Sequence, residues 1–183
     1  MTPHIILVGL PGVGKTTVGR HVAKELGLAF SDFDDEISEK FGKSVAKIFA
    51  EDGEAAFRKA EAELSLGWVS RGPAVLAPGG GWIANREAVA HLRPSCRIIY
   101  LRVSPTEALR RMGRGINRRP LFASGDPVDI MQRLYETRRA YYEADADAVV
   151  ETEGLTRDVL VGRVAGAVSA ILDLKHESHE RRI

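Results

Sequence analysis

The stretch "GLPGVGKTT" (residues 9–17), directly after the apolar run "HIILV" (4–8), decides the fold of this chain. The apolar run is rich in β-branched side chains, which is typical of a strand buried on both faces. A helical pattern follows, with apolar residues at every fourth position from Val18 until Gly27 ends it. The sequence therefore predicts a buried strand, a glycine-rich loop and a helix, in that order.

The glycine-rich loop matches G-x-x-x-x-G-K-[ST], with Gly9, Gly14, Lys15 and Thr16 in register. Glycines let backbone N–H groups approach phosphate oxygens closely, and the following helix points its positive end at the same place. We expect Lys15 to reach the β- and γ-phosphates and the Thr16 hydroxyl to ligate Mg²⁺. The alternative is a tight turn with an exposed lysine, but motif and context agree on a nucleoside triphosphate with Mg²⁺.

Composition limits the class of protein. The 183 residues suit one domain, 44% are hydrophobic, and 26 Lys and Arg against 25 Asp and Glu leave a net charge of +1. A balanced charge gives no general attraction to nucleic acid or anionic membranes, and the apolar runs are too short to span a membrane. Cys96 is the only cysteine, which excludes an internal disulfide. We expect a cytoplasmic monomer without a leader segment, a nucleic-acid partner or a membrane partner.

Two classes of nucleotide-binding protein do not fit. A GTP switch carries an Asn-Lys-x-Asp guanine reader, whereas the asparagines here, at 85 and 117, each precede an arginine. The candidate strands at 74–80 and 96–102 lack the terminal aspartate of an ATPase motor. Acidic residues lie instead early in the chain, within 29–37.

The rest of the chain alternates between short apolar segments and helical patterns. Such alternation predicts an α/β fold, a three-layer α/β/α domain with a five-stranded parallel sheet. Besides the first strand, strands are expected at 29–31, 74–78, 96–102 and 147–150, and helices at 17–26, 35–50, 54–71, 85–92, 105–112, 128–143 and 156–174.

Two segments depart from this alternation within a single domain, 1–183. Residues 33–61 are longer than a crossover needs and are expected to form an acceptor-binding insertion. Residues 113–126 are rich in glycine and arginine and are expected to form a mobile lid. The predicted core is then about 1–32, 62–112 and 127–174, followed by a frayed tail at 175–183.

Three local patterns each allow two interpretations. Arg58 and Glu61 share a helix face, so they form either a surface ion pair or an arginine steadied for an acidic substrate. "PGGGW" (78–82) is either a flexible turn or a place where backbone touches a ligand closely. The arginines of 113–126 belong either to a basic surface loop or to a lid that neutralises charge during phosphoryl transfer.

Taken together, these motifs resemble the shikimate kinase family over roughly residues 5–172. The resemblance implies the P-loop kinase fold of nucleoside monophosphate kinases, with a mobile lid. It also implies transfer of the ATP γ-phosphate to the 3-hydroxyl of shikimate, in aromatic amino-acid biosynthesis. The matching motifs, in the family's order, are "GLPGVGKTTVGR" (9–20), "DFD" (32–34), "GEAAFRKAE" (53–61), "GGG" (79–81), "RPL" (119–121) and "RRAYYEADA" (138–146).

The resemblance assigns a role to each matching residue. On the acceptor side, Asp34 is implied to orient the hydroxyl and take its proton, Arg58 and Arg138 to grip the carboxylate, and the three glycines to line the acceptor. Lys15, Asp34 and Arg119, the lid arginine, form the implied catalytic set. The implied nucleotide site consists of Gly12, Val13, Gly14, Lys15, Thr16, Thr17, Arg119 and Arg110, the last near the adenine. The implied acceptor site consists of Asp34, Arg58, Gly79, Gly80, Gly81 and Arg138. The implied Mg²⁺ shell consists of Thr16 and Asp32.

This sequence departs from the family pattern in ways that keep alternatives open. Trp82 follows the glycines where the family usually has a small residue, and Arg118 precedes Arg119, so either could enter the site. A kinase of another small hydroxy acid such as gluconate is the main alternative. A non-catalytic nucleotide-binding module is a second alternative, which the presence of Asp34 and a lid arginine disfavours.

Overall fold

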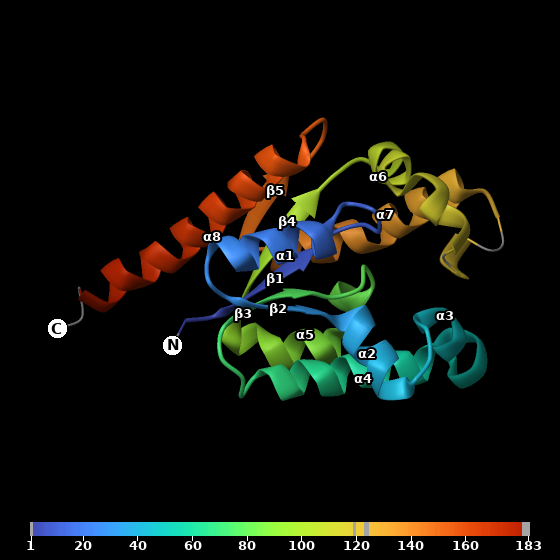
Figure 1. Ribbon diagram of the computed structural model, residues 1–183, viewed down its shortest axis with the longest axis horizontal. Coiled ribbons are helices and arrows are strands. Elements are labelled where there is room, and N and C mark those ends of the chain that lie inside the picture. The colour runs from blue at the N-terminus through green and yellow to red at the C-terminus, as the bar shows by residue number, and fades with distance from the viewer. Residues whose placement is uncertain (1, 119, 123–124, 181–183) are drawn as a thin grey trace.

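The computed structural model describes residues 2–118, 120–122 and 125–180, and its centre is a five-stranded sheet (Figure 1). All strand pairs are parallel and the strand order is β2-β3-β1-β4-β5. The predicted α/β architecture with a five-stranded parallel sheet is therefore confirmed. The strands are β1 (His4–Val8), β2 (Ala29–Asp32), β3 (Ala74–Ala77), β4 (Cys96–Arg102) and β5 (Ala148–Glu151).

Helices cover both faces of the sheet (Figure 1). One face is covered by α1 (Lys15–Glu25) and α8 (Arg157–Glu180), which pack against each other. The opposite face is covered by α4 (Gly53–Trp68) and α5 (Arg86–Leu92), which also pack together. The central strand β1 is thereby enclosed on both sides, as its continuous apolar sequence predicts.

The core is divided between the two faces by strand alternation. Ile5 and Leu7 belong to the cluster under α1 and α8, and Ile6 and Val8 belong to the cluster under α4 and α5. All four side chains are buried. Because successive side chains of a strand point to opposite faces, one short segment anchors both halves of the core. The glycine-rich loop that leaves β1 is held by this rigid base.

The predicted insertion adds a small helical layer after β2. It contains α2 (Phe33–Phe41), α3 (Val45–Lys47) and a π-helical turn at Ile48–Asp52 that leads into α4. A separate apolar cluster holds this layer against α4, and its buried members are Ile37, Ile48, Phe57 and Ala60. The N-terminal half of α4 therefore packs on a hydrophobic cluster that is separate from the main core.

The chain between β4 and β5 carries α6 (Pro105–Met112), two short 3₁₀ turns at Gly113–Arg118 and Pro120–Phe122, and α7 (Pro127–Asp145). The side chains of Ser104 and Asp126 cap α6 and α7. The C-terminal helix α8 continues to Glu180, six residues beyond the predicted end at 174. Within the described ranges, no helix has both the length and the apolarity needed to cross a membrane.

Candidate active site

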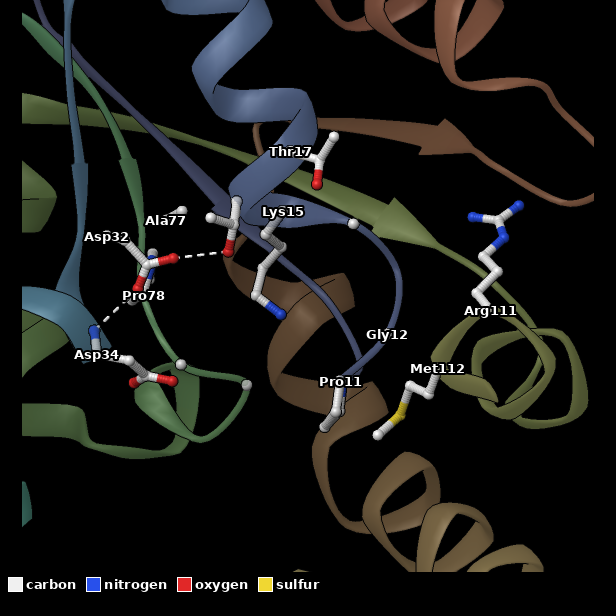
Figure 2. Close-up of a pocket in the computed structure, with 14 residues that line it drawn as sticks. Pro11, Gly12, Lys15, Thr17, Asp32, Asp34, Ala77, Pro78, Arg111 and Met112 are labelled. Atoms are coloured by element: carbon white, nitrogen blue, oxygen red, sulfur yellow. Dashed lines mark hydrogen bonds between the residues drawn. The ribbon is translucent and has the colours of Figure 1, made fainter. Parts of the chain in front are cut away.

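A pocket of about 250 Å³ lies at the carboxyl ends of the central strands (Figure 2). Ligands of open parallel sheets bind at this edge, where neighbouring crossovers leave on opposite faces. Its walls come from the loop after β1, the acidic residues after β2, the segment after β3 and the end of α6. The lining includes Pro11, Gly12, Gly14, Lys15, Thr16, Thr17, Asp32, Asp34, Ala77, Pro78, Gly79, Gly80, Arg111 and Met112.

The loop after β1 lies closely against α6. Gly12 has φ of +85°, a conformation that side-chain-bearing residues rarely adopt. A Cβ atom at Gly12 would lie 2.5 Å from both the Ala108 carbonyl oxygen and the Met112 Cγ atom. Glycine is thus required here by conformation and by contact, and the loop packs against the last turns of α6, directly before the predicted lid.

Helix α1 opens onto this loop without a side-chain cap. Its N-cap residue is Gly14, whereas α6 and α7 begin with capping serine and aspartate side chains. The Lys15 ammonium donates hydrogen bonds to the carbonyls of Gly9 (2.9 Å) and Leu10 (3.3 Å), and Figure 2 shows it extending into the space between loop and acids. Uncapped N–H groups, a helix dipole and an ammonium fit a polyphosphate.

Thr16, Asp32 and Asp34 form one hydrogen-bonded group, and Figure 2 shows the two aspartates facing the loop. The Thr16 hydroxyl donates to Asp32 Oδ2 at 2.6 Å, and the backbone N–H of Asp34 donates to Asp32 Oδ1 at 3.0 Å. Asp32 therefore caps α2 while facing the threonine. Hydroxyl and carboxylate oxygens are the protein ligands that Mg²⁺ prefers, so the chemistry of this pair fits that ion.

The three consecutive glycines after β3 bring the predicted acceptor residues together. A Cβ atom at Gly79 would lie 2.9 Å from Asp34 Oδ1, and one at Gly80 would lie 3.3 Å from Arg138 Nη1. A Cβ atom at Gly81 would lie 2.6 Å from Arg58 Nη2. The functional interpretation of "PGGGW" is thereby favoured, because the absence of side chains lets one carboxylate and two guanidiniums approach the same backbone.

Arg58 is oriented by a partly buried network. Its guanidinium donates to Glu61 Oε2 at 2.7 Å and to Glu54 at 3.1 Å, and the Asn85 amide donates to Glu61 Oε2 at 3.2 Å. The Glu61 side chain is fully buried, which excludes the interpretation of a surface ion pair. Burial raises the pKa of Glu61, although Arg58 opposes that rise. Burial works against the Arg58 charge, yet Glu61 and Glu54 raise the pKa of Arg58 overall.

The two neighbouring arginines at the end of α6 lie in different places. Arg110 is exposed and donates to Glu107. Arg111 lines the pocket, where its guanidinium donates to Thr152 Oγ1 at 3.1 Å and lies 3.5 Å from the Val13 carbonyl. The structure thus brings Arg111, rather than the predicted Arg110, to the wall beside the loop.

Other predicted residues lie elsewhere. Trp82 is fully buried, and its indole N–H donates to Ser65 at 3.0 Å, so it packs beneath the glycines without lining the pocket. The predicted lid arginine, Arg119, lies outside the described residues, and the choice between it and Arg118 stays a prediction.

Three residues of this region were not predicted from the sequence: Arg111, Asn85 and Tyr142. Asn85 is the N-cap of α5 and holds both Glu61 and the Arg58 carbonyl. The Tyr142 hydroxyl donates to the Gly80 carbonyl at 2.8 Å. A signal for Tyr142 was present in the sequence, since it follows Arg138 by four residues and shares its helix face.

The pocket combines a phosphate loop that carries a lysine with a second polar site at the same edge of the sheet. This combination defines a P-loop phosphotransferase that acts on a small molecule. The profile of the family described as "Shikimate kinase" matches residues 11–169. The chain belongs to the shikimate kinase family.

Individual relatives agree with this assignment. A shikimate kinase of Salinispora arenicola is 39% identical over 93% of this chain and 100% of its own length. A shikimate kinase of Caulobacter vibrioides is 39% identical over 96% of this chain and 83% of its own. The structure of Acinetobacter baumannii shikimate kinase in complex with shikimate superposes with a TM-score of 0.86, at 34% identity over 93% of this chain and 94% of that one.

Proposed function

We propose that this chain transfers the γ-phosphoryl group of ATP to the 3-hydroxyl of shikimate, giving shikimate 3-phosphate and ADP. Membership of the shikimate kinase family supports this activity. The observation that carries the proposal is the meeting of Asp34, Arg58 and Arg138 on the three glycines, next to the pocket that holds Lys15. One carboxylate with two guanidiniums suits an acceptor that has both a hydroxyl and a carboxylate.

The nucleotide is expected to bind along the loop at 12–17. Backbone N–H groups and Lys15 hold the phosphates, and Arg111 forms the wall beside the loop. Thr16 and Asp32 would hold Mg²⁺, which when bound neutralises phosphate charge. Lys15 stabilises the negative charge that develops as the γ-phosphoryl group moves.

The acceptor is expected to bind on the glycine segment. Arg58 and Arg138 bind its carboxylate and so fix the ring, which places the 3-hydroxyl near Asp34. In the reaction the hydroxyl oxygen bonds to the γ-phosphorus, the bond to the ADP oxygen breaks, and the hydroxyl proton passes to Asp34. Positioning and charge stabilisation provide most of the catalysis.

The lid is expected to complete the site. Arginine-rich residues at 113–126 close over both substrates, with Arg119 entering beside the phosphates, and water is excluded. Arg110 is a weaker candidate for a position near the adenine. We expect the protein to act as a cytoplasmic monomer without nucleic-acid or membrane partners.

The test is mass spectrometry of shikimate incubated with ATP, Mg²⁺ and purified protein. We expect a product heavier than shikimate by one phosphoryl group. The Asp34→Asn variant should give no such product. Gluconate in a parallel reaction serves as the competing acceptor, an alternative that the relatives above do not support. Phosphorylation of gluconate without phosphorylation of shikimate would overturn the proposal.

A further inference from the structure

Tyr142 lies on α7 and hydrogen-bonds to the glycine segment, and it is not among the residues that the proposed reaction uses. Its side chain is fully buried, and its hydroxyl donates a hydrogen bond of 2.8 Å to the carbonyl of Gly80. The two residues lie 62 positions apart in the chain. This bond therefore joins the helix that carries Arg138 to the backbone on which the acceptor is expected to rest.

Arg138 lies next to this connection. It precedes Tyr142 by one turn of α7, and its Nη1 atom lies 3.3 Å from where a Gly80 Cβ would be. The Tyr142 hydroxyl and the Arg138 guanidinium therefore meet the glycine segment at the same residue, Gly80.

The ring of Tyr142 is held in place independently of its hydroxyl. It stacks on Tyr100 of β4 with ring centroids 4.9 Å apart and planes inclined by 17°. Both rings belong to the apolar cluster under α4 and α5. Because the ring is fixed by packing, the hydroxyl occupies one position and can hold the Gly80 carbonyl in place.

The hydroxyl also keeps its proton across the working pH range. Burial raises the pKa of Tyr142 to about 12, although Arg138 opposes the rise. The bond to the Gly80 carbonyl, which needs that proton, therefore persists wherever the protein is folded and active.

We propose that Tyr142 is a positioning residue for the acceptor, which through its hydroxyl fixes the Gly80 backbone beside the Arg138 guanidinium. The inference rests on the proposed function, in which Arg138 binds the acceptor carboxylate. Tyr142 touches neither substrate. It determines how precisely the arginine and the glycine segment face each other, and therefore how strongly a carboxylate is held between them.

The test compares Tyr142→Phe with Tyr100→Phe. Both changes remove one buried phenol hydroxyl from the same stacked pair and keep the ring. The Tyr100 hydroxyl is buried without a hydrogen-bond partner among the described residues, so its loss is a matched control. We expect Tyr142→Phe to raise the KM and Kd for shikimate about 10-fold, with the KM for ATP changed less than about twofold. Tyr100→Phe should leave all these values within about twofold.

A second measurement separates positioning from general weakening of the fold. In an Arg138→Ala background, adding Tyr142→Phe should raise the Kd for shikimate by less than about threefold, because the oriented group is already absent. Melting temperatures of the two phenylalanine variants establish that both are folded.

The outcomes distinguish this inference from the proposed function. Phosphorylation of shikimate by the unaltered protein, with Tyr142→Phe matching Tyr100→Phe in shikimate affinity, would overturn the positioning role alone. Equal losses of ATP and shikimate affinity in Tyr142→Phe would also overturn it. Absence of shikimate phosphorylation by the unaltered protein would overturn the proposed function and, with it, this inference.

Discussion

Among single residues, Lys15 has the clearest expected effect on turnover. Its ammonium lies on the carbonyls of Gly9 and Leu10 within the pocket, where the transferred phosphoryl group should pass. We expect Lys15→Ala to lower kcat by about 10³-fold or more, because a preorganised positive charge is lost from the transition state. A coupled assay of ADP release measures this.

The matched control is Lys24→Ala, which removes an exposed lysine from the same helix. It should leave kcat unchanged within about twofold, since exposed charges away from the site contribute little. Near-normal turnover of Lys15→Ala would contradict the role given to Lys15.

Gly81 tests the acceptor site through geometry instead of charge removal. Its φ of −90° is open to alanine, but a Cβ atom would lie 2.6 Å from Arg58 Nη2. The whole guanidinium must move to make room, which also strains its ion pair with the buried Glu61. We therefore expect Gly81→Ala to raise the KM for shikimate about 10-fold, because displaced charge-assisted bonds are lost, and to lower the melting temperature moderately without unfolding the protein.

Gly67→Ala is the control for this change. Gly67 lies inside α4 with no atom within 4 Å of a built Cβ, so alanine fits and improves helix propensity. Its shikimate KM should stay unchanged and its stability should rise slightly. A normal shikimate KM for Gly81→Ala would show that Arg58 does not hold the acceptor.

At the level of elements, α6 explains why Arg111 was not predicted as part of the pocket wall. Neighbouring helix positions differ by about 100° in direction, so periodicity alone does not select between Arg110 and Arg111. In the structure Gly12 packs closely against Ala108 and Met112, and Arg111 of the same helix lines the pocket beside the loop. Such a contact between distant segments has no signature in either segment alone.

The local motifs, in contrast, could be predicted from the sequence, because neighbouring residues determine their backbone conformation. The strand, loop and helix around Lys15 follow from backbone requirements written into neighbouring residues. The five parallel strands follow from alternation along the chain. Tyr142 and Asn85 could not be placed in this way, because each acts on a carbonyl or carboxylate brought near by tertiary packing.

The lid segment at 113–126 supplies a prediction about an element. If it closes over bound substrates, trypsin should cut its arginines faster in the free protein than with ATP analogue and shikimate together, since closure protects backbone from the protease. Limited proteolysis followed by mass mapping of the fragments measures the rates. Protection by the nucleotide alone, equal to that by both substrates, would mean that the acceptor does not contribute to closure. Unchanged cleavage would contradict closure itself.

For the whole molecule, the burial of His4 should make the free energy of unfolding depend on pH. Its imidazole lies buried at the start of β1 and donates from Nε2 to the Trp68 carbonyl at 2.9 Å. Burial lowers the pKa of His4 from its ordinary 6.5, although the bond to Trp68 opposes this. The unfolded chain therefore takes up a proton before the folded protein does, and the free energy of unfolding should fall as pH drops below 6.5.

Urea unfolding between pH 5 and 8 measures this dependence. His4→Gln keeps a donor for the Trp68 carbonyl but does not titrate, so its free energy of unfolding should fall less over the same range. Parallel curves for the two proteins would assign the pH dependence to other groups.

The main-chain surface formed by Gly79, Gly80 and Gly81 restricts how such an enzyme can change its acceptor during evolution. With no side chains there, substitutions can only add bulk, and a Cβ atom at any of the three would lie within 3.3 Å of the side chain of Asp34, Arg138 or Arg58. A new acceptor must therefore arise through replacement of the surrounding arginines, which also removes the old one. Gradual broadening of substrate range should be rare in this lineage, and abrupt switches should be the accessible route.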